Sequence, residues 1–181
     1  MKNKILTIAF LLIITLFSSI ASAQKFEQPV LISSAGQSAD VKLVKMLATR
    51  QQLNANTVLM AKPSDLTGIK TLIIVPGFSS KGLGAAGVSQ QEEFERVQSL
   101  VKAANEMKIS IVMVHIGGNA RRKGQSDIFN QLVADNSKFM IVVKQGDEDG
   151  FFTAISKGKK IPLTLVEKIA ETEVPMGNLF K

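Results

Sequence analysis

The feature that most constrains the fold is a continuous apolar run that leads into a loop rich in glycine. Residues 71–76 read Thr-Leu-Ile-Ile-Val-Pro, and residues 77–87 then hold four glycines and one lysine, Lys81. A run without polar alternation is typical of a strand that is buried on both faces of a parallel sheet. Such a strand delivers the loop that follows it to the carboxyl edge of an open α/β sheet, where ligands usually bind. We therefore interpret the rest of the chain as scaffold and partner loops for this edge.

Residues 1–23 have the composition of a secretory signal peptide. Lys2 and Lys4 precede an apolar run over residues 5–17, and Ala21-Ser22-Ala23 supplies small residues for a cleavage site. Because this run is short for a membrane span, cleavage after Ala23 is favoured over retention as an anchor. We expect a periplasmic or secreted protein without stable membrane insertion, whose residues 24–181 form a single α/β domain.

Composition excludes several classes of protein. The chain has no cysteine, so neither disulfide bonds nor a lipid-anchored amino terminus is expected. Without the two lysines of the signal peptide, 20 basic residues remain against 15 acidic ones, a net charge of +5. These charges are scattered, and no tyrosine or tryptophan is available to stack on bases, so no nucleic-acid partner is expected.

Strand and helix signals alternate along the mature chain. Ser89 and Glu92 form a capping box, and Phe94, Val97, Val101 and Ala104 continue it as a helical stripe. Further helices are expected with N-caps at Ser38 and at Ser126 or Asp127, the latter faced by Ile128, Phe129, Leu132 and Val133, and a short one through Phe152. Strands are expected at residues 29–33, 57–61, 72–75, 110–116, 139–143 and 161–166.

This alternation predicts a three-layer α/β fold with a mostly parallel sheet of five or six strands. We expect a Rossmann-like or flavodoxin-like arrangement in the order 2-1-3-4-5, with the sixth strand at an edge. In that order the chain reverses direction between strands one and three, so residues 33–38 and the flexible loop 77–87 would flank a crevice. Both segments are rich in glycine and serine, which suits backbone and hydroxyl donors that approach an anion.

Known nucleotide-binding patterns fit these loops poorly. Residues 33–38, Ser-Ser-Ala-Gly-Gln-Ser, are similar to the T-x-T-G-x-T phosphate loop of flavodoxins, but Ala35 replaces one hydroxyl, and the chain lacks the tryptophan or tyrosine that flanks a flavin. Gly77 and Gly82 have the spacing of a P-loop, yet Leu83-Gly84 stands where Lys-Ser/Thr belongs. Gly82-x-Gly84 resembles part of a dinucleotide fingerprint at the wrong spacing. Flavin is therefore disfavoured, and no cofactor is expected.

His115 is the only histidine and is predicted at the carboxyl end of the fourth strand. A buried, hydrogen-bonded imidazole is one interpretation, and a general base is the other. A serine hydrolase triad would combine His115 with Ser79 or Ser80 and with Asp147 or Asp149, although no G-x-S-x-G elbow supports it. One histidine and no cysteine make a zinc site improbable, so no metal is expected.

Charged residues of two other loops are predicted at the same edge. Arg121 and Arg122 follow Gly117-Gly118, and their guanidinium groups could clamp a carboxylate or a phosphate. The acidic residues 147–149 precede a helix, where they would complement its dipole. A salt bridge from this acidic cluster to the arginines, closing the mouth of the cleft, is an equally weighted alternative.

Several distinctive segments together resemble one family. They are residues 29–40 (PVLISSAGQSAD), 79–87 (SSKGLGAAG), 115–122 (HIGGNARR), 147–153 (DEDGFFT) and 161–169 (IPLTLVEKI). In these segments the chain resembles an uncharacterised family of exported bacterial α/β proteins that is known only as a domain of unknown function. The resemblance implies a location in the bacterial cell envelope or outside the cell, and it implies no activity, substrate or catalytic residue.

Two functions of different classes remain after this reasoning, and a third is structural. The first is a binding protein for a small anionic molecule, and the second is a hydrolase or transferase that uses His115 as general base. The third is an envelope scaffold that docks to a membrane protein partner. The residues expected to bind the ligand are Ser34, Gly36, Ser38, Ser80, Lys81, Gly82 and Arg121, with His115 as the catalytic candidate.

Overall fold

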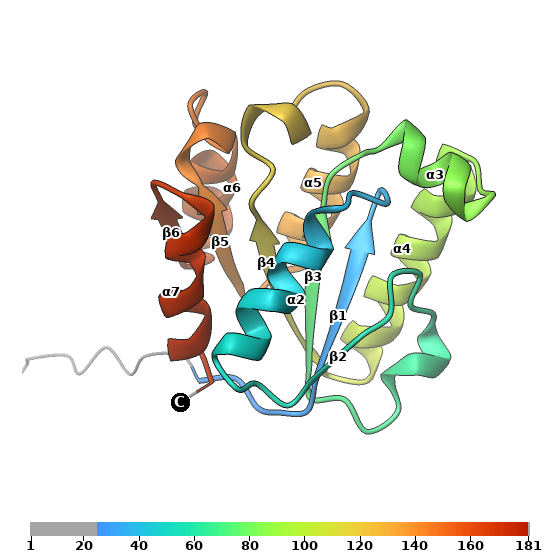
Figure 1. Ribbon diagram of the computed structural model, residues 1–181, viewed down its shortest axis with the longest axis horizontal. Helices are drawn as coiled ribbons and strands as arrows, with labels where there is room; N and C mark the ends of the chain where they lie inside the picture. The colour runs from blue at the N-terminus through green and yellow to red at the C-terminus, as the bar shows by residue number, and fades with distance from the viewer. Residues whose placement is uncertain (1–24, 181) are drawn as a thin grey trace, which may run out of the picture.

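The computed structural model describes residues 25–180, in which six short strands form one parallel sheet (Figure 1). The strand order is β2-β1-β3-β4-β5-β6, which confirms the predicted order with the sixth strand at an edge. The predicted signal peptide lies outside the described residues. The strands are β1 (Val30–Ala35), β2 (Ala55–Thr57), β3 (Thr71–Pro76), β4 (Ser110–His115), β5 (Phe139–Val143) and β6 (Leu163–Val166).

The neighbouring strands β1 and β3 are buried along their whole length, and for β3 the continuous apolar sequence predicts this burial. They pair in parallel from Val30 opposite Thr71 to Ala35 opposite Pro76. Because this register ends both strands at the same level, the segments that follow them emerge side by side at the carboxyl edge.

Helices cover both faces of the sheet, which confirms the three-layer α/β class. One core lies between the sheet and the helices α4 (Gln90–Glu106), α5 (Gln125–Asn136) and α6 (Phe151–Lys159). The other lies between the sheet and α2 (Asp40–Arg50) and α7 (Glu173–Asn178), the two helices on the near face in Figure 1. Alternate residues of each strand serve the two cores, with Ile74 and Met113 in the first and Val75 and Val114 in the second.

Helix α4 begins as predicted. The side chain of Ser89 accepts the N–H of Glu92, and the side chain of Glu92 accepts the N–H of Ser89. The hydrogen bond from the backbone N–H of Ser89 lowers the pKa of Glu92, because it stabilises the charged carboxylate. The buried face contains Val97, Val101 and Ala104, as the helical stripe predicts.

Some element boundaries differ from the predictions. β2 lies two residues earlier than expected and spans only three residues, because only this part of the segment pairs with β1. The N-cap of α2 is Ala39 rather than Ser38, and that of α5 is Gly124 rather than Ser126 or Asp127. Ile128, predicted on the inner face of α5, is exposed, because that helix turns Phe129 and Val133 toward the core.

The largest difference concerns the segment after β3. It was expected to be a flexible loop, but residues 80–86 form the helix α3 (Ser80–Ala86). The hydroxyl of Ser79 accepts the N–H of Gly82 at its start, and Gly87 ends it in the left-handed conformation. Within residues 25–180, none of the helices combines the length and the apolar character that crossing a membrane requires.

Candidate functional site

The ends of β1 and β3 are joined by backbone hydrogen bonds. The N–H of Gly77 donates to the carbonyl of Ala35 (2.9 Å), and the N–H of Ser79 donates to the carbonyl of Gly36 (2.8 Å). Gly36 has a φ of +96°, and a Cβ at this position would lie 2.7 Å from the carbonyl oxygen of Gly77. Only glycine permits this approach. The two segments predicted to flank a crevice therefore form one continuous rim.

A buried ion pair supports the rim from the side of α4. Glu93 has no exposed surface, and its Oε1 accepts the backbone N–H of Gly36 (2.9 Å) and the side-chain amide of Gln37 (3.0 Å). Arg96 pairs with Glu93 (Nε to Oε2, 2.7 Å) and donates to the carbonyls of Ser34 and Ala61, each at 2.7 Å. A carboxylate of the protein itself thus uses the Gly36 N–H that the sequence suggested for a ligand.

The three predicted serines lie in different environments. Ser34 is buried, and its Oγ has no hydrogen-bond partner among the described residues. Ser38 accepts the N–H of Asp40 (3.2 Å), which leaves its own hydroxyl proton for another acceptor. Ser80 is exposed at the start of α3.

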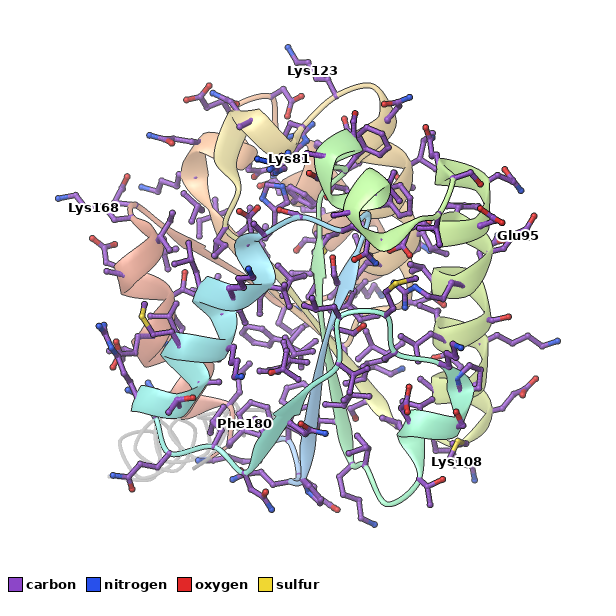
Figure 2. All side chains as sticks on the ribbon, turned by 45° about the vertical axis from the view of Figure 1, so that its right-hand side comes forward. Lys81, Glu95, Lys108, Lys123, Lys168 and Phe180 are labelled. Carbon is purple, nitrogen blue, oxygen red and sulfur yellow. The ribbon has the colours of Figure 1, made fainter. Side chains whose placement is uncertain are left out.

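Lys81 and Gly82 belong to the first turn of α3. Lys81 is exposed at the carboxyl edge of the sheet, whereas Lys108 lies at the opposite end of the molecule (Figure 2). A Cβ at Gly82 would lie only 2.0 Å from the carbonyl oxygen of Gln37. Gly82 therefore allows α3 to lie directly against the segment after β1, which explains its residue type without a ligand.

Arg121 lies next to the same rim. Its Nη1 donates to the carbonyl of Phe78 (2.8 Å), and its Nε is 3.6 Å from Oδ2 of Asp40. Its aliphatic stem fills the space over Gly77 and Gly117, where a Cβ would lie 3.1 and 2.1 Å from it. The Nη2 group has no hydrogen-bond partner among residues 25–180, so Arg121 retains donors for a ligand.

A hollow of about 680 Å³ lies where these segments meet. This volume falls within the usual range of small-molecule pockets. It contains Ser38, Lys81, Gly82 and Arg121 of the predicted set, whereas Ser34, Gly36, Ser80 and His115 are not part of its wall. The remaining lining residues are Gln37, Ala39, Val41, Lys42, Leu59, Met60, Ser79, Ala85 and Ala86.

His115 is buried and lies on the α4–α6 side of the sheet. Its Nε2 is 3.1 Å from the carbonyl of Arg121, and because a carbonyl only accepts, Nε2 carries the proton. Its Nδ1 has no hydrogen-bond partner among the described residues, and the ring lies 4.9 Å from that of Phe152. Burial lowers the pKa of His115, an effect that its hydrogen bond to Arg121 opposes and the charge of Arg122 reinforces. These surroundings match the first of the two interpretations, a buried and hydrogen-bonded imidazole.

The proposed triad partners are engaged elsewhere. Ser79 caps α3, and Asp147 accepts the backbone N–H groups of Phe152 (2.7 Å) and Thr153 (3.1 Å) at the start of α6. Among residues 25–180, His115 makes no hydrogen bond to a serine or a carboxylate. The role of Asp147 confirms the predicted complementation of the helix dipole.

Arg122 closes the neighbouring part of the same edge. Its guanidinium pairs with Asp127 (Nε to Oδ1, 2.8 Å) and Asp149 (Nη2 to Oδ2, 2.9 Å) and lies 4.4 Å from the ring centre of Phe151. The predicted salt bridge between the acidic cluster and the arginines is confirmed for Arg122 and Asp149, whereas Arg121 pairs with Asp40 instead. Burial alone would lower the pKa of Arg122, but its hydrogen bonds to Asp127 and Asp149 outweigh burial and raise it. The same bonds lower the pKa of both carboxyls, although partial burial of Asp127 acts in the opposite direction.

Other hollows lie away from this edge. One of about 440 Å³ is lined by Asn105, Asp135 and Lys138, near the amino ends of β5 and β6, and contains no predicted site residue. Among the described residues, no three acidic or histidine side chains are grouped so that they could hold a metal ion.

Sequence reasoning missed the residues that shape the site from behind. Glu93 was not assigned to the core or to the site from the sequence. However, Glu93 stands four residues before Val97, on the same helical stripe as Val101 and Ala104, and this position indicates an inward-facing side chain. Leu59 and Lys42 were also missed, because no local pattern distinguishes them from other exposed residues.

The fold and the site together define a doubly wound α/β domain with a crevice where the chain reverses direction. The chain matches, over residues 27–180, the model of a family described as a domain of unknown function, DUF6305, and it belongs to that family. This membership confirms the resemblance to an uncharacterised family. No curated protein matches the chain significantly.

Several solved structures share the general arrangement at a distance. A GDSL-like lipase from Bacteroides thetaiotaomicron is 10% identical over 83% of this chain and 73% of its own, with a TM-score of 0.34. The psychrotrophic esterase EstA from a Pseudoalteromonas species is 14% identical over 76% of each chain, with a TM-score of 0.31. AlinE4, an SGNH-hydrolase family esterase, is 13% identical over 89% of this chain and 85% of its own, with a TM-score of 0.30. Likeness at this level carries no argument about activity.

Proposed function

We propose that this protein binds a small anionic molecule in the crevice between α2 and α3. The observation that carries the proposal is the charge of the wall: Lys42, Lys81 and Arg121 line the hollow, and no acidic residue does. Neither lysine has an ion-pair partner among the described residues, and Arg121 keeps a free Nη2 group. Positive side chains around a concave surface raise the local concentration of anions and slow their departure.

The polar groups of the wall suit an anionic head group. Ser38 and Ser79 each use an oxygen lone pair internally, so their hydroxyl protons are available to an anion. Lys81, Ser38 and Arg121 come from three different segments, and binding through all three would fix the orientation of the ligand. We also propose that the protein works in the periplasm or outside the cell, because residues 1–23 have the sequence of a signal peptide.

The test is a thermal-shift screen of organic acids and phosphates on the mature chain. A ligand at 100 times its dissociation constant adds about 2.7 kcal/mol to stability. For a domain of this size we expect the melting temperature to rise by about 5–10 °C. The Lys42→Ala/Lys81→Ala variant should lose most of this shift.

A matched control separates the pocket from the general charge of the protein. Lys45→Ala/Lys157→Ala removes the same number of positive charges from exposed helical positions outside the pocket. It should keep the ligand-dependent shift. The proposal would be contradicted if both double variants lost the ligand-dependent rise in melting temperature equally, or if no anion raised the melting temperature of the wild type.

The enzyme alternative is tested with His115. The buried ring and the bond from Nε2 to a backbone carbonyl favour binding over general-base catalysis. We expect His115→Gln to keep the anion-dependent thermal shift, and the wild type to show no turnover on a panel of simple esters and phosphate esters. Turnover that His115→Gln abolishes would support the enzyme instead. Docking to a membrane partner stays a prediction that a pull-down from cell envelopes would test.

A further inference from the structure

The wall of the hollow contains both polar and apolar side chains. Its cations and hydroxyls are accompanied by apolar side chains from α2, from the segment after β2 and from α3, namely Val41, Leu59, Met60, Ala85 and Ala86. A site for a fully hydrated inorganic ion would gain nothing from such a surface, because apolar wall stabilises only apolar ligand area.

The apolar part is held in place by the core of the protein. The carbonyl of Leu59 accepts the backbone N–H of Ser34 (3.2 Å) and the hydroxyl of Ser33 (3.1 Å). Two residues further along, the carbonyl of Ala61 accepts Nη1 of the partly buried Arg96 (2.7 Å). The segment that carries Leu59 and Met60 is therefore fixed at both ends, although 43% of Leu59 is exposed. A large apolar side chain held open to water at the edge of a hollow is a ready surface for an apolar ligand group.

Helix α3 supplies the opposite wall with small residues. Gly82, Ala85 and Ala86 face the hollow, and the contact of Gly82 with the carbonyl of Gln37 brings this helix close to the rim. Short side chains leave the space between α2 and α3 open. The cations stand around this apolar space, and Asp40, which pairs with Arg121 at 3.6 Å, offsets one of their three charges.

We propose that the ligand is an amphiphilic anion, with an apolar chain or ring between α2 and α3 and a single anionic head group at Lys42, Lys81 and Arg121. This inference rests on the proposed function and names the class of ligand for the same site. A carboxylate is the simplest head group of this kind. The apolar part contributes affinity through burial, and the cations fix the polar end.

The test measures affinity as a function of chain length. Isothermal titration calorimetry with straight-chain carboxylates from acetate to decanoate, each below its micelle concentration, should give an affinity that rises about fourfold per methylene until the hollow is filled. Decanol should bind at least tenfold more weakly than decanoate, because it lacks the charge. Lys42→Ala/Lys81→Ala should weaken all carboxylates by a similar factor.

A pair of leucine variants tests the apolar wall. Leu59→Ser should flatten the dependence on chain length and leave the affinity for acetate unchanged within a factor of two. Leu43→Ser removes a leucine of similar exposure, 40% against 43%, that is not part of the hollow, and it should keep the dependence of the wild type. The melting temperature of each free variant reports whether it is folded, and the comparison of decanoate with decanol needs no variant.

The outcomes distinguish a failure of the amphiphilic ligand from a failure of anion binding itself. If phosphate and acetate bind and chain length has no effect, the anion-binding function stands and the amphiphilic ligand is wrong. If decanol binds as tightly as decanoate, the charged head group is wrong. If no anion of any length binds, both proposals fail together.

Discussion

At the scale of single residues, Glu93 supports the rim of the crevice through its bonds to Gly36 and Gln37. It has no exposed surface, yet it carries a charge that Arg96 and the N–H of Gly36 satisfy. Isolated charges in a protein interior are costly, so each member of such a group depends on the others. The rim of the site is therefore fixed by an interaction that lies behind it.

The first prediction concerns this pair. Glu93→Ala leaves the guanidinium of Arg96 buried without its partner and should reduce the free energy of unfolding by about 3–5 kcal/mol. Glu93→Leu/Arg96→Met removes both charges and should cost less than the sum of the single substitutions. Urea unfolding at pH 7 measures Glu93→Ala, the double variant and the two single substitutions Glu93→Leu and Arg96→Met.

Glu95→Ala provides the control for this prediction. Glu95 belongs to the same helix and points outward (Figure 2), where its one hydrogen-bond donor among residues 25–180 is the side-chain amide of Gln91. Its loss should change stability by no more than about 0.5 kcal/mol. A cost for Glu93→Ala as small as that for Glu95→Ala would show that the pair does not support the rim.

Sequence reasoning located Lys81 and Arg121 correctly at the carboxyl edge, because the ends of parallel strands can be read from apolar runs. It did not identify Glu93, since an acidic residue in the first turn of a helix ordinarily complements the dipole from outside. Nor did it predict the close backbone packing at Gly36 and Gly82. The sequence does not distinguish a glycine that allows close packing from one that contacts a ligand. Only the folded structure shows that a backbone segment distant in sequence lies against it.

At the scale of elements, α3 is the part that differs most from expectation. Four glycines and two serines in residues 77–87 are typical of a loop. The helix forms nevertheless, because Ser79 caps its start and because Gly82 allows it to rest on the segment after β1. This support comes from a contact distant in sequence, so local propensity could not reveal it.

The second prediction uses two glycines of this helix. Gly82→Ala should destabilise the protein by about 1–3 kcal/mol, because the new Cβ would lie 2.0 Å from the carbonyl oxygen of Gln37. Gly84→Ala should stabilise it by about 0.4–1 kcal/mol, since no atom lies within 4 Å and alanine favours helix. Thermal and urea unfolding of the two variants should thus change in opposite directions. A loop at residues 80–86 would instead give two small effects of the same sign.

At the scale of the whole molecule, Arg122 links the ends of β4 and β5 and the start of α5. Its side chain is only 4% exposed and contacts Asp127, Asp149 and Phe151. The order of the strands and the closure of the edge were both predictable, because alternation and charge signs appear in the sequence. Which arginine would close the edge was not, since Arg121 and Arg122 are adjacent and equivalent until the turn at Gly117-Gly118 is known.

The third prediction concerns acid. The pKa values of Asp127 and Asp149 are lower in the folded protein than in the unfolded chain, so their contribution is present at neutral pH and is lost as the pH falls below about 4. Arg122→Gln should therefore cost about 1–3 kcal/mol at pH 7 and show a smaller further loss between pH 5 and pH 3 than the wild type. Urea midpoints across this range measure both effects.

Arg50→Gln is the matched control, because Arg50 forms an exposed ion pair with Glu173. This variant should keep nearly the stability of the wild type at pH 7 and the same decline in acid. Parallel pH curves for the wild type and Arg122→Gln would show that this arginine does not hold the two carboxylates in their charged form.

The internal carboxylate of Glu93 has one further consequence, for the speed of recognition. Many anion sites take shape only when the incoming charge orders their backbone, and that ordering reduces affinity and slows association. Here the carboxylate of Glu93 already accepts the N–H of Gly36 in the rim, so we expect no ordering of this backbone when a ligand binds. The backbones of the free and the ligand-bound protein should accordingly superpose closely, because the site is preformed.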